Sequence, residues 1–177
     1  QKALLIEDIE GRIDTAVDAL IDGRVQASTN AREQSLLRGM TGRVAIANAK
    51  LAYQRYQELF GGRRWQALAA QGARTQRLLW ASTGAKNPGY RDVVYVEELI
   101  GPGTVDTIPP ATFEAFRDHG RPRASLTEDV DVARGTMDRL AQVGISMDDV
   151  TDRLLAEGVQ LFEDAFTKLL KAVEKQS

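Results

Sequence analysis

The stretch "QRLLWASTGAKNPGYRDVVYVEELIGPGTVDTIPPAT", Gln76–Thr112, decides the fold class. Two short apolar runs, near Gln76–Ala81 and Thr104–Ile108, have the length of buried strands and stop at turn-forming residues. The segment between them is rich in valine, which favours a strand, yet three of its apolar residues share one helical face: Val93, Val96 and Ile100. We therefore predict two adjacent parallel strands joined by a helix, with a second helix after the double proline.

The rest of the chain has helical periodicity. Thr127 is expected to cap a helix that carries Val130, Ala133, Met137 and Leu140, and "SMDD" from Ser146 is a capping-box pattern. The apolar stripes are expected to face a core. Their inward positions are Ile13, Val17, Leu20 and Ile21; Val44, Ala47, Leu51, Leu59 and Phe60; and Val159, Phe162, Phe166, Leu169 and Val173.

This order of elements predicts an α/β fold that is mostly helical. Residues 75–120 form its strand–helix–strand–helix core, and residues 127–177 form C-terminal helices. No repeat or linker divides the chain, so residues 1–177 are interpreted as one partial domain. Two parallel strands alone do not make a stable sheet, and such strands need both faces covered. The chain is therefore expected to be one end of a larger α/β fold with a helical tail.

Composition narrows the classes of function. The net charge of -2 argues against a nucleic-acid partner, and no apolar run reaches the length of a membrane span. The chain has no cysteine and one histidine, which excludes a thiolate or histidine-rich metal site. His119 precedes Gly120 and is interpreted as an exposed residue at a helix C-terminus. The N-terminal residues lack the apolar core of a signal peptide, so a cytoplasmic protein is expected.

The end of the first predicted strand has residues suited to holding a phosphate. In βα-barrel enzymes the active site lies at the C-terminal ends of the strands, where loops often bind phosphate. Hydroxyl donors, a backbone open at a glycine, a cation and an amide would all serve there: Ser82, Thr83, Gly84, Lys86 and Asn87. The alternative is an ordinary turn, because serine, glycine, asparagine and proline are all turn formers.

The order of these pieces resembles one family. "RLLWASTGAKNPGYRDVVYVEELIGPGTVDTIPPATFEAFRDHG" is similar to the C-terminal region of transaldolases, in particular the longer bacterial branch that includes fusions to glucose-6-phosphate isomerase. "GRIDTAVD", "MTGRVAIANAKLAYQRY" and "EGVQLFEDAFTKLL" resemble further segments of that region. The resemblance covers almost all of residues 11–170.

The resemblance implies the C-terminal portion of a (β/α)8 barrel. Transaldolases transfer a dihydroxyacetone unit between sugar phosphates of the pentose phosphate pathway through a lysine Schiff base, without a metal or cofactor. By motif, Ser82 and Lys86 would hold the substrate phosphate, and Arg12 would be a further ligand. The sugar-phosphate substrate is thus the expected small-molecule partner.

The chain departs from the family in its lysines. The family's Schiff-base lysine lies inside an apolar strand, and no lysine here has that setting. The chain alone is therefore expected to be inactive. Two alternatives stay open, a non-catalytic half-barrel and a mostly helical assembly protein that keeps a phosphate-binding loop. A homo-oligomer or a complementing barrel half is expected to cover the bare strand edges, or the face that carries Val44, Leu51 and Phe60.

Overall fold

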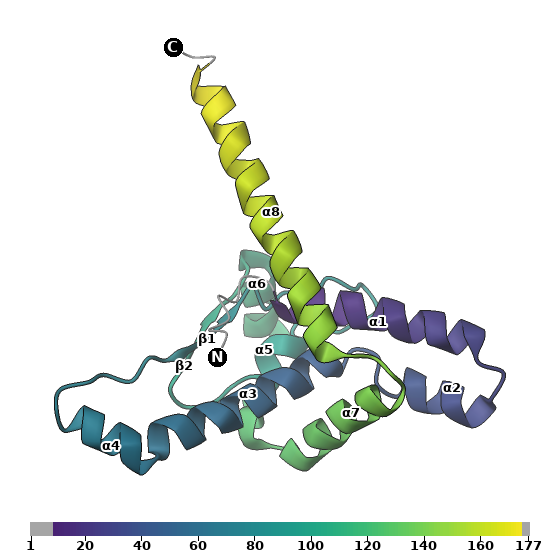
Figure 1. Cartoon of the computed structure of the whole chain (residues 1–177), viewed down its shortest axis with the longest axis horizontal. Coiled ribbons are helices and arrows are strands. Elements are labelled where there is room, and N and C mark those ends of the chain that lie inside the picture. The colour runs from purple at the N-terminus through teal and green to yellow at the C-terminus, as the bar shows by residue number, and fades with distance from the viewer. Residues whose placement is uncertain (1–8, 175–177) are drawn as a thin grey trace. The chain divides into compact units, whose positions relative to one another are not determined.

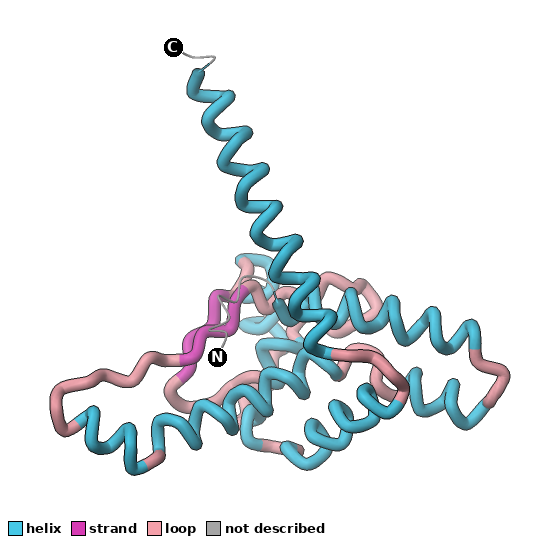
Figure 2. Tube along the Cα trace, in the orientation of Figure 1, coloured by secondary structure: helices cyan, strands magenta, loops and turns pink. Residues whose placement is uncertain are grey.

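The computed structural model describes residues 9–174, and it describes side chains from Arg12 onward. Contacts divide the chain into two compact units, Gln1–Ile145 and Ser146–Ser177. Figures 1 and 2 show the elements of both units, which we describe separately. Among the described helices, none combines the length and the apolar character that crossing a membrane requires.

Four helices precede the first strand in the described part of the chain (Figure 1). The side-chain oxygen of Asn30 accepts hydrogen bonds from the N–H groups of Arg32 and Glu33 and so starts the second helix. The first helix packs against both the second and the third. The four helices are α1 (Ile9–Ala27), α2 (Ala31–Arg38), α3 (Val44–Gly61) and α4 (Arg63–Ala69).

Most of the predicted inward positions on α1 and α3 are buried or half-buried, but two are not. Leu20 is 39% exposed and Leu59 is 42% exposed, so their prediction as core residues is wrong. Leu20 lies beside the stripe formed by Ile13, Val17 and Ile21, and Leu59 lies near the C-terminal end of α3. A side chain at the margin of an apolar stripe meets a neighbouring element on one side only, which periodicity does not reveal.

The predicted parallel strands are confirmed. Strand β1 (Leu78–Ala81) pairs in parallel with β2 (Thr104–Thr107), with Leu78 opposite Thr104 and Ala81 opposite Thr107. Each strand is followed by a helix, α5 (Val94–Glu98) and α6 (Pro110–His119) (Figure 2). A parallel pair needs a crossover connection, and the segment that contains α5 supplies it. Both strands therefore end at the same edge, immediately before the candidate site.

One face of the strand pair packs against helices. Trp80 on β1 is 2% exposed and lies in a buried cluster with Ala49 and Tyr53 of α3, Leu99 and Leu126. Leu126 is fully buried and belongs to a short 3₁₀ helix, η1 (Ser125–Thr127). This cluster anchors β1 two residues before the candidate site. Burying an indole contributes more than burying any smaller side chain.

The face of α3 that was expected to be bare is partly filled by the chain itself. Val44 is fully buried. The ring of Phe60 packs against Tyr56 and Trp65, with ring centroids 4.9 and 4.6 Å apart. The expectation of an exposed face is therefore wrong at Val44, which is buried. Phe60 is half-buried, because its ring is partly covered by Tyr56 and Trp65. A covering partner chain stays a prediction.

The helix that follows η1 begins three residues later than its predicted cap. Thr127 lies within η1, and α7 (Val130–Gln142) starts after Asp129, whose φ of +54° is left-handed. Asp129, and not Thr127, therefore occupies the N-cap position of α7, so the prediction of Thr127 as the cap is wrong. The Asp129 side chain makes no capping hydrogen bond. Ala133 and Leu140 are buried as expected. A capping residue type identifies where a helix can start, and the turn made by η1 decides where it does.

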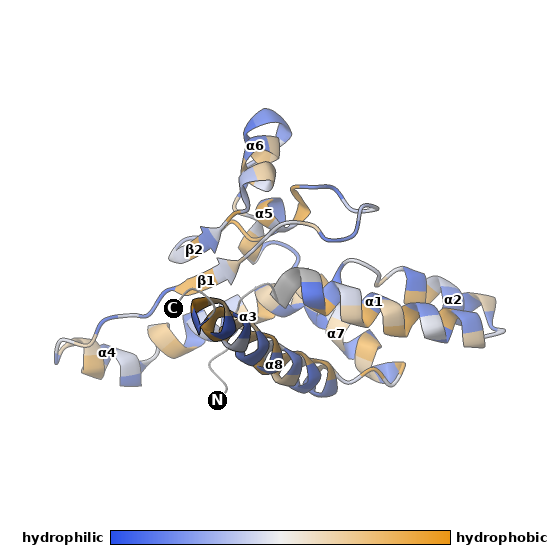
Figure 3. Ribbon diagram, turned by 90° about the horizontal axis from the view of Figure 1, so that it is seen from above, coloured by the Kyte–Doolittle hydropathy of each residue, from blue (hydrophilic) through white to orange (hydrophobic). Residues whose placement is uncertain are grey.

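The second unit contains one described helix, α8 (Met147–Glu174). The Ser146 hydroxyl oxygen accepts a hydrogen bond from the Asp149 N–H at 3.2 Å, which confirms half of the predicted capping box. Hydrophobic and hydrophilic residues share the length of α8 (Figure 3). The prediction that its stripe is buried is wrong, because Val159, Phe162, Phe166, Leu169 and Val173 are 51–64% exposed. A single helix has no second element in its unit to cover its apolar stripe.

Candidate functional site

A tight turn, Ser82–Gly84, follows β1; we call it the strand-mouth turn. Ser82 has a left-handed backbone, with φ at +55°, and it is one of two non-glycine residues in the described chain with positive φ. The Gly84 N–H donates to the Ser82 carbonyl oxygen at 2.8 Å and closes the turn. Left-handed backbone is unfavourable for a residue with a Cβ, so surrounding contacts must hold Ser82 in place.

The hydroxyl of Thr83 points into the protein and not toward a ligand. Thr83 is fully buried, and its Oγ1 donates to the Asp106 carboxylate, 3.0 and 3.1 Å from its two oxygens. Burial raises the pKa of Asp106 to about 6, although hydrogen bonds from Thr83 and the Thr107 N–H lower it. Thr83 thus serves the turn itself, which leaves Ser82 as the hydroxyl at its surface.

Gly84 is also enclosed. A Cβ at this position would lie 3.2 Å from Pro109 Cγ and 3.2 Å from Thr112 Oγ1, at the start of α6. The expectation that the backbone is open at Gly84 is therefore wrong. The close approach that requires glycine comes from the segment after β2, because a side chain would push that segment away.

Lys86 and Asn87 lie on the surface after the turn. The Asn87 side-chain oxygen accepts from the Gly89 N–H at 2.9 Å, so this end of the amide is used in a local turn. The Asn87 side chain also hydrogen-bonds the Tyr90 side chain, which lies three residues later. The structure therefore places half-buried Ser82 and exposed Lys86 and Asn87 on one short segment, within six residues of the end of β1.

Arg12 lies at the start of α1, and the residues after it tie that helix to the segment beyond Lys86. Asp14 accepts hydrogen bonds from the Ala45 N–H at 2.9 Å and from Tyr95 Oη at 2.6 Å. One turn later, Asp18 accepts from the Gly42 N–H and from Tyr90 Oη. These bonds hold α1 against both the N-terminus of α3 and the helix that connects the strands. Sequence periodicity shows none of them, because their partners lie 24–81 positions apart.

Asp14 gives a prediction for stability. Burial raises its pKa to about 6, against hydrogen bonds from Tyr95 and Ala45 that lower it. The folded state thus binds the Asp14 proton more tightly than the unfolded state does. The stability that this proton binding contributes is present below about pH 4 and is lost as the pH rises through 6. The free energy of unfolding of Asp14→Asn, taken relative to that of wild type, should therefore rise by about 2 kcal/mol between pH 4 and pH 7.

Urea unfolding of both proteins across this pH range measures the difference. Asp22→Asn, on an exposed position of the same helix, is the matched control for removing a carboxylate from α1. A difference between Asp14→Asn and wild type that does not change with pH would contradict the prediction.

Family comparison agrees with these segments. The model of the transaldolase/fructose-6-phosphate aldolase family matches residues 11–173. The chain belongs to this family. Transaldolase of Trichodesmium erythraeum is 44% identical over 167 residues, covering 93% of this chain and 44% of that protein. Transaldolase 1 of Streptomyces coelicolor is 47% identical over 160 residues, which are 90% of this chain and 41% of that protein. Transaldolase of Acidothermus cellulolyticus is 51% identical over 134 residues, 75% of this chain and 36% of that protein.

The chain spans less than half of the length of these transaldolases. Family membership covers the strand-mouth turn, both strands and the helix between them, since all lie within the matched residues. The identity of the chain as a transaldolase-family member thus agrees with the parallel strand pair that the structure shows.

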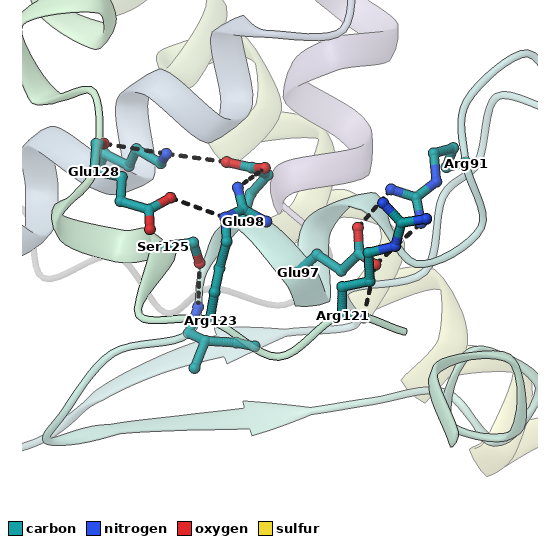
Figure 4. Close-up of polar contacts among 9 residues, drawn as sticks. Arg91, Glu97, Glu98, Arg121, Arg123, Ser125 and Glu128 are labelled. Carbon is teal, nitrogen blue, oxygen red and sulfur yellow. Dashed lines mark hydrogen bonds and ion pairs between the residues drawn. The ribbon is translucent and has the colours of Figure 1, made fainter. Parts of the chain in front are cut away.

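A network of ion pairs fixes the connecting helix α5 of this transaldolase-family chain (Figure 4). Arg91 contacts both oxygens of the Glu97 carboxylate at 2.6 and 3.0 Å, and the Arg121 N–H donates to the same group. Burial alone would raise the pKa of Glu97, but these hydrogen bonds hold it below its ordinary value. The network joins α5 to the segment after α6. Sequence analysis missed it because the charges are scattered along the chain.

The neighbouring carboxylate, Glu98, binds the only lysine among the buried residues of the described chain. Lys50 of α3 is 4% exposed, and its Nζ donates to Glu98 Oε2 at 3.0 Å and to the Glu128 carbonyl oxygen at 3.3 Å. Arg123 contacts both Glu98 and Glu128. Lys50 thus has a structural partner on each side, which is the arrangement that buried charges need.

A cavity of about 470 Å³ lies beside this network. Its lining comes from the start of α3, the segment after Asn87, α5 and α7, and it includes Arg43, Lys50, Tyr90 and Asp129. Neither Ser82 nor Lys86 lines it, so it is separate from the strand-mouth turn. Among the described residues, no cluster of three or more histidine, aspartate or glutamate side chains is arranged to hold a metal ion.

The single histidine has the position that its sequence context predicted. His119 ends α6 with its side chain 45% exposed. Its Nε2 lies 3.0 Å from Asp92 Oδ1 and its Nδ1 lies 3.2 Å from Asp118 Oδ2. These hydrogen bonds raise the pKa of His119 above its ordinary value. Both ring nitrogens are engaged by carboxylates, so His119 contributes to the surface charge pattern and not to the turn after β1.

Proposed function

We propose that this chain is the C-terminal part of a transaldolase and that the strand-mouth turn holds the phosphate of a sugar-phosphate substrate. The observation that carries the proposal is the left-handed backbone of Ser82 at the C-terminal end of β1, with Lys86 four residues later. Strained backbone at a strand end is typical of ligand sites. Family membership over residues 11–173 supports the same reading.

In this proposal three residues bind the phosphate. The Ser82 hydroxyl donates a hydrogen bond, Lys86 supplies a compact positive charge, and Arg12 at the start of α1 is a further cationic ligand. The Asn87 amide nitrogen is an additional donor. Thr83 and Gly84 support the turn, since both are buried and the Thr83 hydroxyl is engaged by Asp106. Anchoring the phosphate orients the distant reacting carbons of the sugar.

The covalent chemistry belongs to another part of the complete protein. The proposed reaction transfers a dihydroxyacetone unit through a lysine Schiff base, and such a lysine must be desolvated to act as a neutral amine. The two described strands have the sequences LLWA and TVDT and carry no lysine. We therefore assign binding of the substrate phosphate to this chain and the Schiff base to a complementing part of the barrel. An assembly with that part, or with further copies, would cover the strand edges.

A lysine substitution tests the phosphate site. Lys86→Ala should weaken binding of a ketose phosphate by about 10- to 150-fold, because it removes a charge-assisted contact worth roughly 1.5–3 kcal/mol. Binding of the unphosphorylated ketose should change much less. Calorimetric or NMR titration of the 177-residue chain with both sugars measures the two effects.

Lys168→Ala is the matched control, because it removes the same charge from an exposed position on α8. It should leave both affinities near the wild-type values. Equal losses for both sugars in Lys86→Ala would show that Lys86 is not a phosphate ligand. Retention of both affinities in Lys86→Ala would favour the alternative in which the turn binds nothing.

A further inference from the structure

The strand-mouth turn begins where the backbone pairing of the two strands stops. Ala81 lies opposite Thr107 at the last paired position, and Ser82 is the next residue. From here a side chain replaces the missing backbone partner. The Ser82 N–H donates to Thr107 Oγ1 at 3.0 Å, and Thr107 Oγ1 lies 3.4 Å from the Trp80 carbonyl oxygen, to which it donates. The Thr107 hydroxyl thus donates to β1 and accepts from the first residue after it.

The residue before Thr107 holds the other half of the turn. Asp106 lies opposite Trp80 in the strand register, and its carboxylate accepts the hydroxyl proton of Thr83. Thr83 is fully buried, so this bond is shielded from competing water. Two successive residues of β2 therefore contact two successive residues of the turn, and Pro109 and Thr112 enclose Gly84 on a third side.

These contacts offset an intrinsic cost. A non-glycine residue in the left-handed region costs of order 1–3 kcal/mol, and it persists only where neighbouring groups over-determine it. The hydrogen bond that ties Ser82 to β2 is the one from its N–H to Thr107 Oγ1. Without the Thr107 hydroxyl, Ser82 would lose this anchor and its N–H would lose its acceptor.

We propose that Asp106 and Thr107 of β2 are positioning residues for the anion site, which set the left-handed turn at Ser82 without touching the anion. This inference rests on the proposed function, because it takes the turn to be the phosphate site. In this proposal the affinity for the anion depends on β2, because its Asp106 and Thr107 side chains contact the turn without contacting the anion. The two strands then form one binding unit, with ligands supplied after β1 and geometry supplied by β2.

The test compares two threonines on the same strand. Thr107→Val keeps the shape of the side chain and removes the hydroxyl that anchors Ser82. Thr104→Val is the matched control, because it removes the hydroxyl that donates to the Gly101 carbonyl oxygen at 2.8 Å at the opposite end of β2. Thr107→Ser restores the hydroxyl and serves as the rescue variant.

Two measurements on the 177-residue chain separate positioning from general stability. The first is the three-bond coupling between the amide and α protons of Ser82, with its ¹³C shifts, which report whether its backbone is left-handed. The second is affinity for inorganic sulfate, a dianion of phosphate shape, at constant ionic strength. Thr107→Val should change the Ser82 signals and lower sulfate affinity by about tenfold, the factor that loss of a hydrogen bond near 1.4 kcal/mol gives. Thr107→Ser and Thr104→Val should both stay within about twofold of wild type, well inside that same factor.

Each outcome decides a separate claim. Unchanged Ser82 signals in Thr107→Val overturn the positioning role, whether or not sulfate binds. Changed signals with unchanged sulfate affinity overturn the link between turn geometry and anion binding. Equal affinity losses in Thr107→Val and Thr104→Val show a merely structural effect and overturn the proposal. Absence of sulfate binding in wild type counts against the proposed phosphate site, while the Ser82 signals still report on the contact with β2.

Discussion

The 177-residue chain alone is expected to give no aldol transfer and no borohydride-trapped adduct with a ketose phosphate. Removing an enzyme's covalent nucleophile lowers the rate by on the order of a million-fold, which places any residual transfer below detection. Neither strand carries a lysine, and the Nζ of buried Lys50 is occupied by Glu98 and by the Glu128 carbonyl oxygen. Lys86 is exposed and lies after the turn, outside both strands.

Mass spectrometry after borohydride reduction measures the adduct, and a coupled assay measures the transfer. Transaldolase 1 of Streptomyces coelicolor, treated in the same way, is the positive control for the trapping chemistry. An adduct on this chain would contradict the prediction, and peptide mapping would show which lysine had formed the imine. Binding of the ketose phosphate without an adduct is the expected combination, since the chain is proposed to hold the phosphate only.

Trp80→Ala is expected to lower the free energy of unfolding by about 3–5 kcal/mol, the range for removing a large aromatic side chain from a core. Trp80 is 2% exposed and packs with Tyr53, Leu99 and Leu126. These contacts join β1 to α3 and η1, so Trp80→Ala destabilises the strand that ends at Ala81, directly before Ser82. Urea unfolding followed by circular dichroism measures the change without relying on the fluorescence of the indole.

Two further variants keep this prediction decisive. Leu79→Ala, at the neighbouring position on β1, is the matched control; Leu79 is 41% exposed, so its loss should be below about 1 kcal/mol. Trp80→Phe keeps an aromatic ring, so its free energy of unfolding can be measured if Trp80→Ala does not fold. The indole Nε1 has no hydrogen-bond partner among the described residues, so Trp80→Phe loses packing and no hydrogen bond. A loss in Trp80→Ala no larger than in Leu79→Ala would show that the cluster around Trp80 does not support β1.

Local pattern was sufficient for the elements around the site. The apolar runs at Leu78–Ala81 and Thr104–Thr107 form strands as predicted, because each run is short and ends at turn-forming residues. The valine-rich segment between them contains a helix as predicted, but the helix is short, Val94–Glu98, and only Val96 of the predicted helical face lies within it. The connection is long enough for the crossover that a parallel pair needs, and the two strands do pair in parallel.

Pattern failed where burial depends on a partner. The stripe of α8 has the same periodicity as the stripe of α1, yet Phe162 is 64% exposed and Val17 is fully buried. Periodicity identifies the face of a helix that can be buried, and the elements that reach that face decide whether it is. The same limit explains Leu20 and Leu59, which lie at the margins of buried stripes.

The residue types in the strand-mouth turn were identifiable from the sequence. Which of them face the surface and which support the turn from inside was not. Ser82, Thr83 and Gly84 all suit a phosphate loop by composition. The structure turns Thr83 toward Asp106 and packs Gly84 against Pro109, which leaves Ser82 at the surface. Neighbouring residues of one turn face in different directions, and the amino-acid sequence alone does not show those directions.

By itself, the sequence determined the family, through the resemblance of its motifs to transaldolases. It also determined the strand–helix–strand order and the segment that bears the candidate ligands, because these depend on residue types and on spacing along the chain. Only the tertiary structure decided that Asp106 and Thr107 support the turn after β1, that Asp14 and Asp18 hold α1 to Tyr95 and Tyr90, and that Lys50 is buried against Glu98. Each of these contacts joins residues 23–81 positions apart. Such pairs meet only when the helices and strands pack, so their chemistry is a property of the folded chain.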